Sequence, residues 1–300
     1  MILEVLGPTF LLVAVGYLLG RFGRLPARPF AEASFWILSP ALIFETLRTA
    51  QLPAQDALLV ALFVLTHYGL MFLLSLPFGR KLFPTDSDAR RATSLLLTFG
   101  NCGNLGLPIL LFAFGTRGKD VGVIFLATNT VLLATLGVGI AAWRGRLDLR
   151  ALARQALLVP WPYAVALAVG VRAAQAWPTV LARASGLLAE AAIPVFLLLL
   201  GLELASVDLQ AVGRPGVYLA LARLAVASLL AWVLTPLFTG DPVVRGSLVI
   251  EGSVPSAVNA YILAAQYRRR PDLAATVLLL STLFSLATLS LTLFLLARLG

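Results

Sequence analysis

Gly100-Asn101-Cys102-Gly103-Asn104-Leu105-Gly106-Leu107-Pro108 lies within an apolar segment, residues 91 to 114, that is long enough to cross a bilayer. Pro removes a backbone donor and each Gly destabilises a helix by about 1 kcal/mol relative to Ala, so we expect the helix to be unwound here. A second stretch, Glu251-Gly252-Ser253-Val254-Pro255-Ser256-Ala257-Val258-Asn259, interrupts the segment at 243 to 266 in the same way. Pro108 and Pro255 are 147 residues apart, so the interruptions take corresponding places in two halves of the chain.

The composition around these stretches is that of an integral membrane protein. Of the 300 residues, 60% are hydrophobic and 12% are charged, about half the charged fraction of an ordinary globular domain. Apolar and polar residues do not alternate every second position along these segments, which predicts helices rather than a barrel. The expected spans are 4 to 20, 30 to 47, 57 to 78, 91 to 114, 119 to 142, 157 to 173, 186 to 203, 214 to 238, 243 to 266 and 273 to 297.

The two halves resemble each other at an offset of about 150 residues. Asp120 followed by Asn129-Thr130 parallels Asp272 followed by Ser281-Thr282, and the third and eighth spans both end near a Pro. Five spans per half is an odd number, so the halves must have opposite orientations in the membrane. We therefore expect an all-α membrane fold of ten helices in two inverted five-helix repeats, residues 1–142 and 157–300. A short cytoplasmic linker, residues 143–156, joins them.

Charge sets the expected orientation. The odd-numbered connectors hold 15 Lys and Arg residues, whereas the even-numbered connectors and the C-terminal stretch hold seven. The positive-inside rule then makes the odd connectors cytoplasmic and both termini extracytoplasmic, in a multi-pass protein of the cell membrane. The net charge of +9 is spread over loops without a basic patch interleaved with aromatics, so we expect no nucleic acid partner.

The paired interruptions predict where a ligand binds. Broken backbone at membrane depth is tolerated where it is buried in protein or lines a wet cavity. In secondary transporters such breaks form the binding site, where half-helix N-termini face anionic groups and freed carbonyls coordinate a cation. The alternative is a pair of kinks that only shape packing.

The block from Gly100 to Pro108 resembles the signature of the auxin efflux carrier family, and the block from Glu251 to Asn259 resembles its ninth-helix counterpart. This resemblance implies a fold like that of bile-acid symporters and sodium/proton antiporters, with crossing broken helices 4 and 9 between a scaffold domain and a transport domain. It also implies small organic anions such as auxin-like acids or malonate as cargo, and a homodimer through the scaffold. The short linker is typical of prokaryotic members.

The candidate site residues lie in and beside the two breaks. Glu251 is the carboxylate inside an interrupted span, where an ionised group costs at least roughly 2.5 to 3.5 kcal/mol, so it needs a proton, a cation or a partner. It either couples ions or bonds the broken backbone. The resemblance favours Asn101 for direct contact with a carboxylate. The expected substrate-binding residues are Asn101, Gly103, Asn104, Pro108, Pro255, Ser256 and Asn259, and the expected residues for ion or proton coupling are Glu251, Asn129 and Thr130.

The roles of three further polar residues stay open. His67, the single histidine, is in a typical place for an interior packing group, with a proton relay as the alternative. Arg223, about nine residues into the eighth span, either leans toward the cytoplasmic interface or pairs with a carboxylate such as Glu251. Glu203 lies near the end of the seventh span, where an interfacial position is expected.

The leading function is a secondary carrier that moves organic anions by alternating access. A sodium-coupled symporter of the bile-acid type is the nearest alternative, and the coupling ion, H+ or Na+, stays open. A channel or receptor needs no inverted repeat. An enzyme needs a nucleophile with a base or a metal cluster, and one His and one Cys without a paired motif argue against it, as they do against a cofactor.

The charge bias makes residues 144 to 154 cytoplasmic. A cysteine introduced by Asp148→Cys in a Cys102→Ala background should be protected from a membrane-impermeant maleimide in intact cells and labelled after permeabilisation. Labelling of position 148 from outside intact cells would contradict the orientation.

Overall fold

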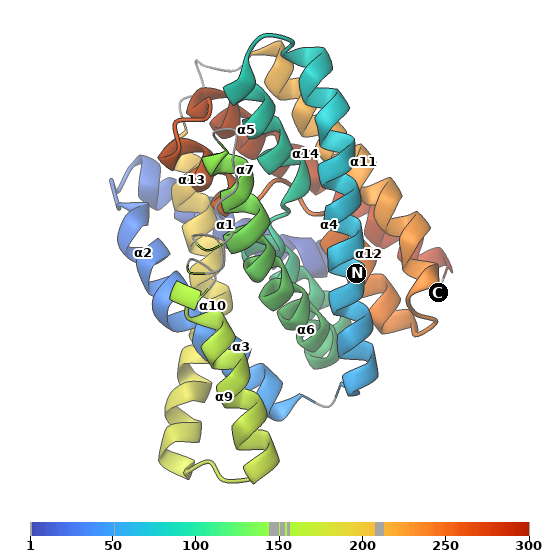
Figure 1. Ribbon diagram of the computed structural model, residues 1–300. Helices are drawn as coiled ribbons and strands as arrows, with labels where there is room; N and C mark the ends of the chain where they lie inside the picture. Colours follow the sequence, from blue (N-terminus) through green and yellow to red (C-terminus); the bar gives the residue numbers. More distant parts are fainter. Residues whose placement is uncertain are drawn as a thin grey trace.

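The computed structural model describes residues 2–50, 52–143, 150, 154, 157–207 and 213–299, and their regular structure is helical (Figure 1). Most of the expected linker 143–156 lies outside the described residues. The first half contains α1 (Ile2–Arg21), α2 (Ala27–Ala33), η1 (Ser34–Leu38), α3 (Ser39–Thr49), α4 (Ala54–Leu82), α5 (Ser87–Thr98), η2 (Cys102–Gly106), α6 (Leu107–Leu132), η3 (Leu133–Gly137) and α7 (Val138–Ala142). The second half contains α9 (Trp161–Ala174), α10 (Thr179–Ala205), α11 (Arg214–Leu234), η5 (Thr235–Leu237), α12 (Pro242–Ser253), α13 (Val258–Gln266) and α14 (Pro271–Leu299).

The helices agree with the expected membrane spans. Among the described residues, seven helical stretches are long and apolar enough to cross a bilayer. One of them, the 41 residues Cys102–Ala142, contains the end of the fourth expected span and all of the fifth. Gly115, at φ 63°, breaks the helix between these two spans where the sequence predicts a connector. The inverted repeat of ten helices stays an expectation with which these elements agree.

The two interruptions are real breaks in the helices. α5 ends at Thr98 and its chain resumes as helix at Cys102, and α12 ends at Ser253 before α13 begins at Val258. Both leading half-helices have 12 residues. Pro40, in contrast, does not break its helix. The π-helical turn η1 immediately before α3 accommodates the missing backbone donor of this proline.

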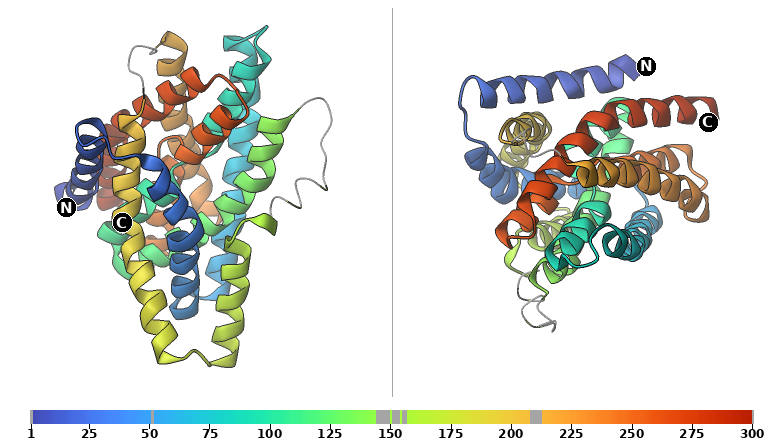
Figure 2. Two further views of the ribbon diagram at one scale, coloured as in Figure 1. Left: turned by 90° about the vertical axis from the view of Figure 1, so that its left-hand side faces the viewer. Right: turned by 90° about the horizontal axis from the view of Figure 1, so that it is seen from above.

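The helices pack in two groups. α1 and α3 pack against α10, and α9 packs against α3, which forms one group, the scaffold. The other group consists of α4 to α7 and α11 to α14. The hairpin of α9 and α10 extends beyond the other helices at one end (Figure 1), and α1 lies along the edge of the bundle (Figure 2). One apolar cluster fills the second group, and another joins the scaffold to the broken helices.

Small residues bring α1 and α10 into close contact. A Cβ on Gly16 would lie 2.2 Å from the carbonyl oxygen of Leu198, and one on Gly201 would lie 2.1 Å from that of Val13. Without a hydrophobic drive between helices in lipid, such backbone approach is a main source of association. The scaffold is therefore a tightly packed body against which the second group lies.

Candidate functional site

The two broken helices satisfy each other's backbone where they meet. Gly100 and Ser256 form an isolated antiparallel bridge. The N–H of Asn101 donates to the carbonyl of Pro255 at 2.8 Å, and the N–H of Ala257 donates to the carbonyl of Phe99 at 3.0 Å. Because hydrocarbon offers no hydrogen bonds, this pairing is what permits extended backbone at membrane depth.

Side chains from neighbouring helices complete the crossing. The hydroxyl of Ser256 donates to the carbonyl of Leu96 at 2.8 Å, and its N–H donates to the hydroxyl of Ser281 at 3.2 Å. The N–H of Gly100 donates to the hydroxyl of Tyr68 at 3.3 Å. The crossing is thus stabilised by side chains of α4 and α14 as well as by the bridge between its own two extended segments.

The trailing half-helices begin without side-chain caps. Asn101 precedes η2 and Ala257 precedes α13, and neither helix start receives a side-chain hydrogen bond at its cap position. The first N–H groups of a helix lack intrahelical partners and carry a partial positive charge. Both helix starts therefore favour an anion.

A cavity of about 1100 Å³ lies between the scaffold and these helix starts. Asn104, Thr130 and Asn259 line it from the crossing side, and Phe196 and Glu203 of α10 line it from the scaffold side. Its walls reach Arg28 in the first connector and Tyr267 in the ninth. The charge bias predicts both connectors to be cytoplasmic, so the cavity connects the crossing with the expected cytoplasmic face.

Glu251 lies behind the crossing, in α12, and is fully buried. Among the described residues, neither of its carboxyl oxygens has a hydrogen-bond partner. Two glycines make room for the carboxyl: a Cβ on Gly106 would lie 2.2 Å from Oε2, and one on Gly122 would lie 3.2 Å from Oε1. An ionised carboxylate in such a place is costly, and a proton removes the larger part of that cost by neutralising the charge.

A protein family described as membrane transport protein matches residues 1–151 and 145–293. The chain belongs to this family. The match confirms the resemblance to the auxin efflux carriers that the two interrupted segments indicated. The protein is therefore a membrane transporter.

Relatives of this transporter carry similar names. It is 26% identical to an uncharacterized transporter of Methanocaldococcus jannaschii over 94% of both chains. It is 27% identical to a putative malonate transporter of Rhizobium meliloti, over 94% of this chain and 92% of the relative. An uncharacterized transporter of Methanothermobacter thermautotrophicus is 27% identical over 93% of both chains.

The residues predicted for substrate binding or for ion coupling differ in whether they line the cavity. Asn104, Thr130 and Asn259 line the cavity, and Gly103 is half-buried beside them. Asn101 is 5% exposed and its Nδ2 has no partner among the described residues. The other predicted residues, Pro108, Asn129, Pro255 and Ser256, are buried and do not line the cavity.

The sequence reasoning missed part of the scaffold wall. Glu203, in the last turn of α10, is 9% exposed and lines the cavity. Tyr261, one turn into α13, lines the same cavity. The signal for Tyr261 was its spacing, since it follows Val258 by three residues and shares its helix face.

The structure also shows where His67 and Arg223 lie. His67 is fully buried in α4, its Nε2 lies 3.0 Å from the carbonyl of Ala227, and its ring stacks on Phe63. Arg223 neither leans to an interface nor hydrogen-bonds to Glu251. It is fully buried and donates to backbone carbonyls.

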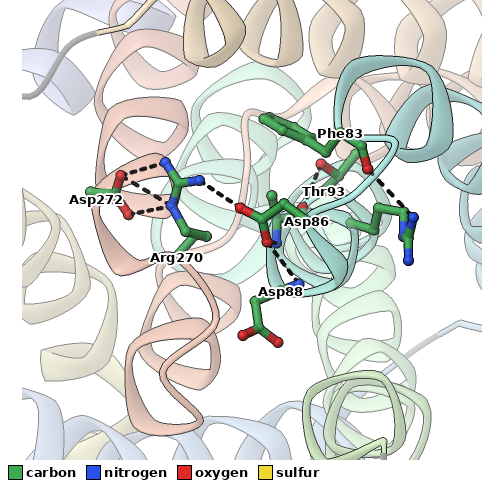
Figure 3. Close-up of polar contacts among 8 residues, drawn as sticks. Phe83, Asp86, Asp88, Thr93, Arg270 and Asp272 are labelled. Carbon is green, nitrogen blue, oxygen red and sulfur yellow. Dashed lines mark hydrogen bonds and ion pairs between the residues drawn. The ribbon is translucent and has the colours of Figure 1, made fainter.

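Each leading half-helix starts at an aspartate that also binds an arginine from the other half. Oδ1 of Asp86 accepts from the N–H groups of Asp88 and Ala89, and its Oδ2 accepts from Arg270 at 2.8 Å (Figure 3). Oδ1 of Asp241 likewise accepts from Val243 and Val244, and its Oδ2 accepts from Arg117 at 2.6 Å. Arg270 and Arg117 each follow the opposite broken helix, so the two ends of the crossing are fastened in the same way.

The hydrogen bond from Ala89, with that from Arg270, holds the pKa of Asp86 below its usual value. Asp86→Ala should lower the melting temperature, because a lost N-cap costs about 1 kcal/mol. Asp86→Asn keeps a capping oxygen and should lose only the ion pair, about 0–1 kcal/mol. Thermal unfolding in detergent measures both, with Asp241→Asn as the matched variant at the other end.

The same series has a defined pH dependence. Because folding lowers the pKa of Asp86, its charged form contributes stability above about pH 4, and this contribution is lost as the pH falls toward the lowered pKa. The difference between the wild type and Asp86→Asn should shrink on acidification. An Asn variant as unstable as the Ala variant at neutral pH would show that the ion pair, not the cap, dominates.

Proposed function

We propose that this transporter carries small organic anions, with dicarboxylates such as malonate as the first class to test, by alternating access at the crossing of its broken helices. The observation that carries the proposal is the cavity of about 1100 Å³ that ends at Asn104, Asn259 and the uncapped start of α13. The name of the relative from Rhizobium meliloti supports the choice of malonate.

The chemistry of the cavity suits a carboxylate. The amide groups of Asn104 and Asn259 supply N–H donors, and the start of α13 adds backbone N–H groups and a partial positive charge. Glu203 of α10 lines the same cavity as Tyr261, which lies in the first turn of α13. We place the substrate carboxylate at the first turn of α13, where the uncapped backbone N–H groups lie.

The two helix groups supply the moving parts. The scaffold is closely packed at Gly16 and Gly201, whereas the crossing belongs to the other group. A shift of the crossing past the scaffold would close the cavity on the cytoplasmic side and open it on the other. A homodimer through the scaffold helices stays a prediction.

Glu251 is the proposed coupling residue, neutralised by a proton in at least one transport state. Its buried carboxyl has no hydrogen-bond partner among the described residues and lies against Gly106 of the other broken helix, which supports this role. Among the described residues, Tyr68 and Cys102 are titratable groups near this carboxyl. A sodium-coupled symporter remains the alternative, and transport with and without sodium separates the two.

Malonate should raise the melting temperature of the purified protein, since a ligand that binds the native state stabilises it. Asn104→Ala and Asn259→Ala should each weaken malonate binding by roughly 10- to 100-fold, as expected for a lost hydrogen bond to a charged group. Asn101 does not line the cavity, but its Nδ2 has no partner among the described residues and it directly precedes η2, so we expect it to turn to the ligand: Asn101→Ala should abolish the malonate-induced shift and leave the unliganded melting temperature within a few degrees.

The control for this series is Thr128→Val, because the hydroxyl of Thr128 bonds its own helix at Ile124 and does not line the cavity. Malonate should stabilise that variant as it does the wild type. If a series of small mono- and dicarboxylates stabilises the wild type and all three Asn variants equally, the carboxylate does not bind at the crossing.

Glu251→Gln should imitate the protonated form of Glu251. Malonate binding should survive in this variant and depend less on pH than in the wild type, because the titrating group of the protein is gone and only that of malonate remains. In liposomes, accumulation driven by a pH gradient should fail while exchange of internal for external malonate continues. Glu190→Gln, an exposed position on α10, is the matched control. Gradient-driven accumulation in Glu251→Gln like that of the parent would make Glu251 a structural residue.

A further inference from the structure

Arg223 is the largest fully buried side chain among the described residues. It projects from α11 toward the crossing, and its Nη1 donates to the carbonyls of Leu97 at 2.8 Å and Thr98 at 3.1 Å. Its Nη2 and Nε donate to the carbonyl of Val254 at 3.1 and 3.3 Å. Each of the three guanidinium nitrogens therefore binds a main-chain carbonyl.

These carbonyls belong to the ends of the two leading half-helices. Leu97 and Thr98 are the last residues of α5, and Val254 follows the last residue of α12. The last four carbonyls of a helix have no intrahelical partner, and the helix dipole makes that end negative by about half a charge. Two such ends converge at the crossing, so a cation is needed between them.

In transporters with broken helices, carbonyls freed by the break coordinate the coupling Na+ or a proton-carrying group. Here the guanidinium already occupies that place. Gly100 leaves the space for it, because a Cβ on Gly100 would lie 2.4 Å from Nη2. A Na+ ion would have to displace N–H donors from each of these carbonyls and lie beside a fixed positive charge, which Coulomb repulsion opposes.

We propose that Arg223 is a tethered cation that replaces a metal ion at the convergent helix ends, which makes this transporter independent of Na+. The part that concerns coupling rests on the proposed function, whereas the part that concerns Arg223 and the helix ends does not. A guanidinium suits the site because its planar, divergent N–H groups can reach carbonyls on two chains at once.

The first test needs no substrate. The melting temperature of the wild type should be the same in NaCl, KCl and choline chloride at equal ionic strength. Arg223→Lys keeps the charge and should unfold at a higher temperature than Arg223→Met, which keeps a long apolar stem without charge. Arg172→Met, at an exposed position on α9, is the control for loss of an arginine elsewhere.

A second measurement separates a cation site from simple packing. Arg223→Ala should be stabilised by millimolar guanidinium chloride relative to choline chloride, whereas the wild type and Arg172→Met should respond to both salts alike. Millimolar guanidinium is far below the molar range in which it denatures proteins. Equal effects of the two salts on Arg223→Ala, or equal stability of the Lys and Met variants, would overturn the proposal.

If no Arg223 variant can be purified, the wild type still decides the question. Specific stabilisation of the wild type by Na+, or uptake of malonate that requires Na+, would contradict the proposal that Arg223 takes the place of a metal ion. A protein that is insensitive to Na+ but also fails to bind any carboxylate would leave the role of Arg223 intact and refute the proposed cargo instead.

Discussion

Everything in this transporter depends on how two breaks in the helices are satisfied inside a bilayer. Unpaired backbone groups cost several kcal/mol each in hydrocarbon. The short antiparallel bridge between Gly100 and Ser256 meets this constraint with main-chain bonds, and Tyr68 and Ser281 add side-chain bonds from two further helices. The breaks can therefore persist at a depth where a lone unwound helix could not.

At the crossing, the two positive and the two negative ends of the half-helix dipoles also lie in different places. The starts of η2 and α13 lack side-chain caps and lie on the side of the cavity, whereas the ends of α5 and α12 converge on Arg223. Positive dipole ends are thus available to an anion, and negative dipole ends are already neutralised by the protein's own cation. Both kinds of helix end meet at the crossing because each of the two helices is interrupted once and the two interruptions run antiparallel to each other.

Glycine makes these charged contacts sterically feasible. Gly100 leaves room for the guanidinium, and Gly106 and Gly122 leave room for the carboxyl of Glu251. Arg223 and Glu251 thus occupy separate places and are not hydrogen-bonded to each other. The two side chains therefore have different roles. Arg223 donates hydrogen bonds to main-chain carbonyls, whereas the carboxyl of Glu251 has no hydrogen-bond partner among the described residues.

The sequence by itself determined the solvent, the helical class, the positions of the spans and the two interruptions, because hydropathy, Gly and Pro act locally along the chain. It also predicted Asn104 and Asn259 as site residues because both lie beside a break, and both line the cavity. It could not decide the partners of Arg223 or the burial of Glu203, because these depend on which helices meet. The choice between a carboxylate and backbone carbonyls for Arg223 was made by tertiary structure alone, since only the convergence of α5 and α12 creates a negative site deep enough to hold a guanidinium.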